Sequence, residues 1–223
     1  MKIGRIVDLS RSVDKHTQVY PGDPHVRLER AATLEADGVN VLGVHIGSHS
    51  GTHVDAPYHF IEDGERIDAM DPGLFVGPAV VVNVRGKGPR ERITVQDLQP
   101  YEPHLAEGVI AIIRTGWEEC YGDAAYYDHP FLDGRAAHLI LDAGVKTVAI
   151  DALNVDETVP VGEEPPGGFA AHRAILGAGG VIAENLTNLE AVDFPDPIVS
   201  LLPVKLGGSD GAPVRAVAME VLA

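Results

Sequence analysis

Short runs of apolar and often β-branched residues recur along the chain and predict most of its strands. The clearest are residues 78–84 and 108–114, which are apolar at nearly every position, as is typical of strands buried on both faces. Residues 26–35 alternate weakly between apolar and polar side chains and predict another strand. Further apolar runs predict strands at residues 3–9, 39–46, 145–151, 181–184, 198–205 and 213–221.

One helix and two short helices are predicted from their end signals. Residues 134–143 and 169–176 each run into a glycine, the residue that most often follows the end of a helix. Thr94 followed by Asp97 is typical of a helix start. The order of helices and strands is too irregular for a regular series of βαβ units. No glycine-rich phosphate-binding motif follows a predicted strand, so no nucleotide cofactor is expected.

Three connecting segments are candidates for pocket walls or contacts. Residues 10–24 contain the stiff sequence Tyr20-Pro21-Gly22-Asp23-Pro24, which either walls a pocket lined by Tyr20 or serves only as a structural turn. Residues 117–134 are rich in aromatic side chains and predict either a cover over an aromatic substrate or a contact between subunits. Residues 152–168 are rich in proline, glycine and acid and predict a loop.

Length and charge narrow the class of protein. A chain of 223 residues suits one domain with a sizeable core. Its net charge of −16 argues against nucleic acid or an anionic membrane surface as a partner. Cys120 is the single cysteine, so no internal disulfide can form. There is no run of apolar residues long enough for a signal peptide or a transmembrane helix, and we expect a cytoplasmic protein.

The candidate chemistry is concentrated in one segment, His49-Ser50-Gly51-Thr52-His53-Val54-Asp55-Ala56-Pro57-Tyr58-His59. Its three histidines and its aspartate are separated by even numbers of residues, so on an extended chain their side chains would share a face. Glycine, serine, threonine and proline disfavour a helix, and we expect the strand at residues 39–46 to lead straight into this segment and end in a loop. Two imidazoles and one carboxylate suit Zn, Mn or Fe(II) and leave an open position, as catalytic metal sites do. The alternative is a set of unrelated loop histidines.

The same segment resembles the signature of the metal-dependent cyclase-type hydrolases, a superfamily that includes bacterial kynurenine formamidase and isatin hydrolase. Tyr20-Pro21-Gly22-Asp23 resembles an early motif of that family, and Glu184-Asn185-Leu186 resembles a late one. Residues 203–208 and 209–216 resemble its C-terminal pattern. The resemblance therefore covers nearly the whole chain.

The resemblance implies a single α/β domain over residues 1–223, with a central β-barrel-like core flanked by a few helices, of the swivelling β/α/β type. It implies a homodimer or a homotetramer. It also implies a divalent metal, either zinc, with two ions favoured, or manganese. The matching positions make His49, His53 and Asp55 ligands of a first ion and His172 and Glu184 ligands of a second, with Asp55 bridging the two.

The activity implied is amide hydrolysis by metal-activated water, with His59 as the catalytic residue. The substrate implied is a small aromatic amide, first N-formylkynurenine, which yields kynurenine and formate. Alternatives are isatin or another cyclic amide, a lyase or cyclase reaction on a polyketide-like ring, and a non-catalytic metal-stabilised binding protein. The long acidic loop at residues 161–168 departs from a kynurenine formamidase and leaves the substrate open. The aromatic candidates for the pocket are Tyr20, Tyr58, Phe60 and Trp117.

Overall fold

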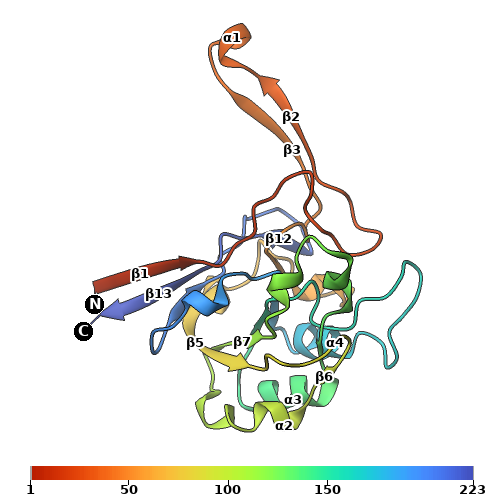
Figure 1. Cartoon of the computed structure of the whole chain (residues 1–223), viewed down its shortest axis with the longest axis vertical. Coiled ribbons are helices and arrows are strands. Elements are labelled where there is room, and N and C mark those ends of the chain that lie inside the picture. The colour runs from red at the N-terminus through yellow and green to blue at the C-terminus, as the bar shows by residue number, and fades with distance from the viewer. Residues whose placement is uncertain (1, 223) are drawn as a thin grey trace.

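A mixed sheet of nine strands runs through the protein (Figure 1), whose structure, a computed structural model, describes residues 2–222. The order across the sheet is β1-β13-β11-β5-β7-β9-β10-β4-β12. The four strands β5, β7, β9 and β10 run parallel to one another. Each strand on either side of them pairs antiparallel with its neighbour. In this order the strands are β1 (Lys2–Asp8), β13 (Val217–Leu222), β11 (Ile198–Ser200), β5 (Val76–Asn83), β7 (Ile110–Arg114), β9 (Thr147–Ile150), β10 (Val181–Glu184), β4 (His53–Asp55) and β12 (Gly211–Pro213).

The core is divided by the sheet into two layers. Successive side chains of a strand point to opposite faces, so Ile112 of β7 packs into one layer with Phe75 and Leu186, while its neighbour Ile113 packs into the other. Both isoleucines are fully buried. Burial on both faces explains why the parallel strands are continuous apolar runs in the sequence.

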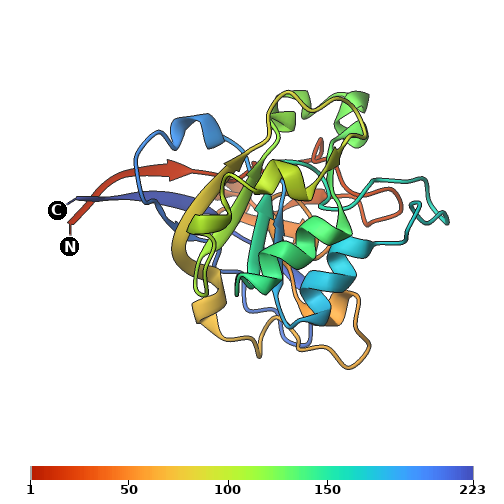
Figure 2. The ribbon, with the colours of Figure 1, turned by 90° about the horizontal axis from the view of Figure 1, so that it is seen from below.

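Helices cover one face of the sheet (Figure 2). They are α2 (Val95–Leu98), α3 (Gly134–Asp142) and α4 (Ala170–Gly177), and α3 packs against α4. Thr94 and Asp97 form a reciprocal capping box at the start of α2, as the sequence predicts. Short 3-10 helices lie in the connections: η1 (Pro57–His59), η2 (Pro72–Phe75), η3 (Glu102–His104), η4 (Trp117–Cys120), η5 (Ala124–Asp128) and η6 (Leu189–Ala191).

An arm projects away from the sheet (Figure 1). It consists of β2 (Arg27–Ala32), α1 (Leu34–Asp37) and β3 (Val41–His45), with β2 and β3 paired only to each other. A second small ribbon pairs β6 (Arg92–Ile93) with β8 (Phe131–Leu132). Val41, Leu42 and Val44 of the arm are each at least half exposed, at 50%, 54% and 55%. Hydrophobicity therefore predicted the strand β3 correctly, but not that it would be exposed.

The structure corrects three sequence expectations. The strand predicted at residues 39–46 does not lead straight into the histidine segment, because β3 ends at His45 and a turn follows. The strand predicted at residues 213–221 is interrupted and forms β12 and β13 on distant parts of the sheet. The expected barrel-like core is not seen, because β1 and β12 stand at opposite ends of the strand order.

Within residues 2–222, no helix has the length and apolar character needed to cross a membrane.

Candidate metal centre

The histidine segment contributes to the site through three different local structures. His53 and Asp55 lie on β4, two residues apart, so both side chains point to the same face of the sheet. His49 lies in the turn before β4, and His59 ends η1. The expectation that one extended stretch would aim all four side chains together is thus correct only for His53 and Asp55. The other two converge through a turn and a short helix.

Two residues more than one hundred positions along the chain complete the cluster. Glu184 ends β10 and lies directly opposite His53 in the antiparallel pair β10–β4. His172 lies in α4. The Nε2 atom of His172 is 3.3 Å from Asp55 Oδ2 and 3.6 Å from Glu184 Oε1. The structure thus brings together all six residues that the sequence predicted as metal ligands or catalytic histidine.

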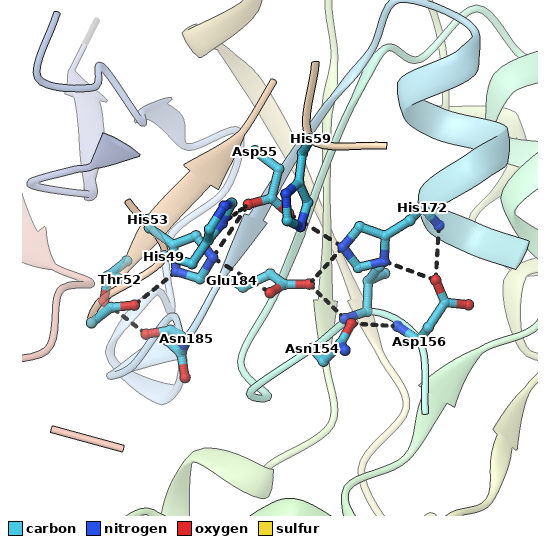
Figure 3. Close-up of polar contacts among 12 residues, drawn as sticks. His49, Thr52, His53, Asp55, His59, Asn154, Asp156, His172, Glu184 and Asn185 are labelled. Atoms are coloured by element: carbon cyan, nitrogen blue, oxygen red, sulfur yellow. Dashed lines mark hydrogen bonds and ion pairs between the residues drawn. The ribbon is translucent and has the colours of Figure 1, made fainter. Parts of the chain in front are cut away.

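Asp55 stands between two groups of imidazoles (Figure 3). Its Oδ1 atom is 2.7 Å from His49 Nδ1 and 3.3 Å from His53 Nε2. Its Oδ2 atom faces His172 instead. Glu184 likewise spans the site, with Oε2 at 3.5 Å from His53 Nε2 and Oε1 toward His172. The two carboxylates therefore connect two half-sites.

Each imidazole is oriented by an acceptor behind it. Since a carbonyl or carboxylate oxygen can only accept, the ring N–H donates: His53 Nδ1 to Gly51 O at 2.9 Å, and His49 Nε2 to Asp210 Oδ2 at 2.9 Å. His172 Nδ1 donates to Asp156 Oδ2 at 2.8 Å. The second nitrogen of each ring faces the centre of the site: His53 Nε2, His49 Nδ1 and His172 Nε2. Such acceptors are the usual second layer of protein metal sites.

Charges at the centre are tightly coupled. Burial opposes ionisation of Asp55, but His49 and the other imidazoles hold the pKa of its carboxyl well below the usual range. Burial and the nearby Asp55 carboxylate raise the pKa of Glu184 to about 7. Burial alone would lower the pKa of His172, yet its hydrogen bond to Asp156 and the nearby carboxylates of Asp55 and Glu184 raise it to about 10. The centre therefore attracts positive charge strongly.

The residues present fit a divalent cation. Asp55 Oδ2 is a buried oxygen without a hydrogen-bond partner among the described residues. An unpaired buried oxygen of this kind is costly unless a cation or a donor compensates it. Ligand-capable atoms lie within 4.8 Å of one another in two sets that share Asp55, one with His49 and His59, the other with His53 and Glu184. Nitrogen and carboxylate donors without thiolates suit Zn or Mn.

A cavity of about 230 Å³ opens beside these ligands. Tyr20 and Phe60 line it, as the sequence suggested, and so do Phe169 and Leu153. Trp117 does not belong to the lining; it packs against the core layer that contains Ile113, and its Nε1 donates to Ala125 O at 3.0 Å. Tyr58 is likewise outside the lining, with the Arg66 guanidinium 4.0 Å from its ring centre.

Several residues of the site were missed from the sequence. Asp156 lies in the loop at residues 152–168, where an acidic residue carries no signal of its own, and it also accepts from the Ala171 and His172 amides at the start of α4. Asp210 belongs to a motif that the family resemblance includes, but the motif did not indicate its contacts. Phe169 precedes α4 and looked like an ordinary helix residue.

Comparisons with known proteins show which sequences are similar to this chain. Residues 7–157 match the family model of the cyclases, described as "Putative cyclase". The kynurenine formamidase of Bacillus cytotoxicus is 32% identical over 220 residues, covering 97% of this chain and 98% of that protein. The kynurenine formamidase of Salinibacter ruber is 35% identical over 218 residues, covering 95% and 96%.

Solved structures share the fold. Isatin hydrolase A from Ralstonia solanacearum superposes with a TM-score of 0.86 at 26% identity, covering 97% of this chain and 92% of that chain. A structure described as a potential metal-dependent hydrolase with cyclase activity gives a TM-score of 0.76 at 26% identity, covering 98% and 99%.

Proposed function

The chain belongs to the cyclase family, and from that premise we propose that it is a metal-dependent amide hydrolase of the kynurenine formamidase type. The observation that carries the proposal is Asp55, a fully buried carboxylate whose two oxygens face different imidazoles while one of them has no hydrogen-bond partner among the described residues. The similarity to kynurenine formamidases over nearly the full chain supports the reaction type.

We assign the ligands from the directions in which the side chains point. His49, His53 and Asp55 hold one ion, and Asp55, His172 and Glu184 hold a second, with zinc favoured over manganese. A divalent cation held there supplies Lewis-acid chemistry: it polarises a carbonyl oxygen and lowers the pKa of a water ligand toward about 7. Asp156 fixes the ring orientation of His172, and Asp210 fixes that of His49, each through a hydrogen bond to the ring.

His59 moves the proton. Its Nδ1 lies 3.3 Å from Asp210 Oδ2, and because the carboxylate accepts, the lone pair of Nε2 is available in the cavity. His59 takes a proton from the attacking water as the oxygen adds to the amide carbon. It then gives that proton to the departing nitrogen as the C–N bond breaks. An imidazole suits both steps because the same ring nitrogen can accept a proton and give it back.

The cavity fits a small aromatic amide. Phe60 and Phe169 lie against each other with ring centres 5.3 Å apart, and Tyr20 adds a third aromatic wall. An aryl group packs well on such edges and faces. N-formylkynurenine is our first substrate. A cyclic amide such as isatin is the second, supported by the shared fold of the Ralstonia isatin hydrolase.

The test is turnover of N-formylkynurenine and of isatin by protein stripped of metal and reloaded with zinc or manganese. We expect hydrolysis of one substrate, loss of metal and activity together in Asp55→Ala, and loss of turnover with retained metal in His59→Ala. If His59→Ala also loses metal, His59 is a ligand rather than the proton carrier. Metal bound in stoichiometric amount without turnover of either substrate would refute the proposed reaction and favour a binding protein.

We also propose that two or four copies assemble through the arm. A two-stranded ribbon is only marginally stable alone in water, yet β2 and β3 pair only with each other and expose Leu42 and Val44 on one of their faces and Val41 on the other. A second copy of the chain would cover these side chains. Leu34 and Val39 at the tip are exposed as well, at 64% and 54%.

A further inference from the structure

We propose that Asp210 is a positioning residue that couples metal binding to proton transfer, because one of its carboxylate oxygens holds both His49 and His59. The proposal rests on the ligand and proton-transfer roles given above to these two histidines. Asp210 itself touches neither the reacting atoms nor the proposed ions.

The geometry is that of one acceptor shared by two rings. Asp210 Oδ2 is 2.9 Å from His49 Nε2 and 3.3 Å from His59 Nδ1. The two imidazoles lie beside each other, with centroids 4.0 Å apart and planes 35° from parallel. A carboxylate oxygen only accepts, so each ring must carry its hydrogen on the nitrogen that faces Asp210.

This placement decides what the other nitrogen of each ring can do. The other nitrogen of His49, Nδ1, lies 2.7 Å from Asp55 Oδ1 and donates to it in the metal-free protein. A cation in the first half-site would take the place of that hydrogen, while the Nε2–H stays on Asp210 Oδ2. With Nδ1–H of His59 donated to the same oxygen, Nε2 is the free base in the cavity. A tautomer is set by the hydrogen bond on the opposite nitrogen, so a single carboxylate makes one histidine a ligand and the other a base.

Asp210 is itself held rigidly in register with the ligands. Its carbonyl accepts from the Ala56 amide at 2.8 Å, directly after β4, and its Oδ1 accepts from Ser209 Oγ at 3.3 Å. The next residue, Gly211, pairs with Asp55 across β12 and β4. Asp210 is thus fixed by the same backbone segment that carries the ligands. Such support keeps the geometry of a site within a narrow range.

Two separable effects follow from the shared oxygen. Through His49, loss of the carboxylate weakens metal affinity. Through His59, it lowers turnover even when metal saturates the site. Outer-layer partners of metal ligands typically contribute about 10–100-fold to affinity or activity, and we expect Asp210→Ala to fall in that range for both. Asp210→Asn keeps an acceptor oxygen in place and loses only the charge, so it should retain part of each effect.

The experiment is a double-mutant cycle with two readouts. Zinc affinity is measured by competition with a chromophoric chelator, and the visible spectrum of the cobalt-loaded protein reports ligand geometry at His49. The kcat is measured at saturating metal in the wild type, Asp210→Ala, Asp210→Asn, His59→Ala and the double variant. Because Asp210 acts on turnover through His59, adding Asp210→Ala to His59→Ala should not lower kcat further, while metal affinity should still fall.

Asp68→Asn is the matched control. Asp68 accepts from the Gly208 amide at 3.0 Å, so the variant removes a carboxylate that contacts the loop of Asp210 without touching either histidine. It should leave zinc affinity, cobalt spectrum and kcat near wild type. Zinc affinity and cobalt spectrum unchanged in both Asp210 variants would overturn the link to His49. An equal further loss of kcat on the His59→Ala background would overturn the link to His59. Absence of turnover in the wild type itself would count against the proposed function alone, because the affinity ratio would still decide the role of Asp210.

Discussion

Replacing Glu184 with glutamine is expected to stabilise the metal-free protein and to weaken the metal-loaded one. Glu184 is buried, its Oε1 accepts from the Val155 amide at 2.7 Å, and it faces the Asp55 carboxylate across the site. Glutamine keeps the shape and the acceptor for Val155 but removes the charge. The variant therefore separates the cost of a buried anion from its use as a metal ligand.

The magnitude follows from the pKa of Glu184, which burial and Asp55 raise from the usual 4.5 to about 7. That difference corresponds to an upper limit of about 3 kcal/mol. The folded metal-free protein holds this proton more tightly than the unfolded chain, so its stability falls as pH rises from the ordinary pKa through the raised one. Above the raised pKa the full cost is present in the wild type and absent from Glu184→Gln.

With metal bound, the wild type is expected to be more stable than Glu184→Gln. Metal at a thousand times its Kd stabilises the wild type by about 4 kcal/mol, and the variant gains less because it has lost a charged ligand. The assay is urea unfolding at mildly alkaline pH, in a chelator and in excess zinc, followed by circular dichroism. Asp151→Asn is the control, because Asp151 is also buried, with a pKa raised by burial to about 6, but its oxygens accept from Thr115 and Gly116 instead of facing the site.

The reasoning would be refuted if Glu184→Gln were less stable than the wild type in the chelator by the same amount as in zinc. Glu184 would then stabilise the fold without any cation, and metal binding would not be the reason for its buried carboxylate. The Asp151→Asn change should be the same in chelator and in zinc.

Three further predictions concern a glycine, a histidine and the arm. Gly211→Ala should reduce zinc affinity in the chelator competition, since an added Cβ would lie 2.6 Å from Val54 O and 2.9 Å from His49 Cε1; unchanged affinity would show that His49 can move freely. His129 is buried between Pro130 O and Thr158 Oγ1, and burial lowers its pKa to about 4. The unfolded chain binds this proton at higher pH, so His129 by itself lowers the free energy of unfolding by about 2 kcal/mol as the pH falls from 7.5 to 5. In urea unfolding, the change of stability over this pH range should differ between the wild type and His129→Gln by that amount; the same change in both proteins would contradict the assignment. Val44→Lys, on the 55% exposed side chain of β3, should lower the mass measured by light scattering toward that of one chain, and an unchanged mass above one chain would show that the arm is not the contact.

Local sequence signals were enough for most elements. The parallel strands were predicted because they are buried on both faces and thus apolar throughout. The helix start at Thr94 and the end of α3 before Gly144 were predicted because helix ends depend on residues adjacent in sequence, while α4 runs one residue further than predicted and includes Gly177. His53 and Asp55 were predicted to share a face because the period of a strand is fixed. Each of these signals acts within a few residues of the chain.

The sequence by itself thus predicted which side chains of the histidine segment gather at the candidate site and, through the family resemblance, which distant residues lie beside them. Only the tertiary structure decided which nitrogen of His49 and of His172 faces the centre, because the carboxylates that orient these rings, Asp210 and Asp156, lie in separate loops, 161 and 16 residues away in the chain. It also decided that β3 leaves the sheet in an arm, since an apolar strand has the same pattern whether it packs inside one molecule or is left exposed on its surface. Hydrophobic periodicity specifies a face to be covered, and the long-range contacts specify what covers it.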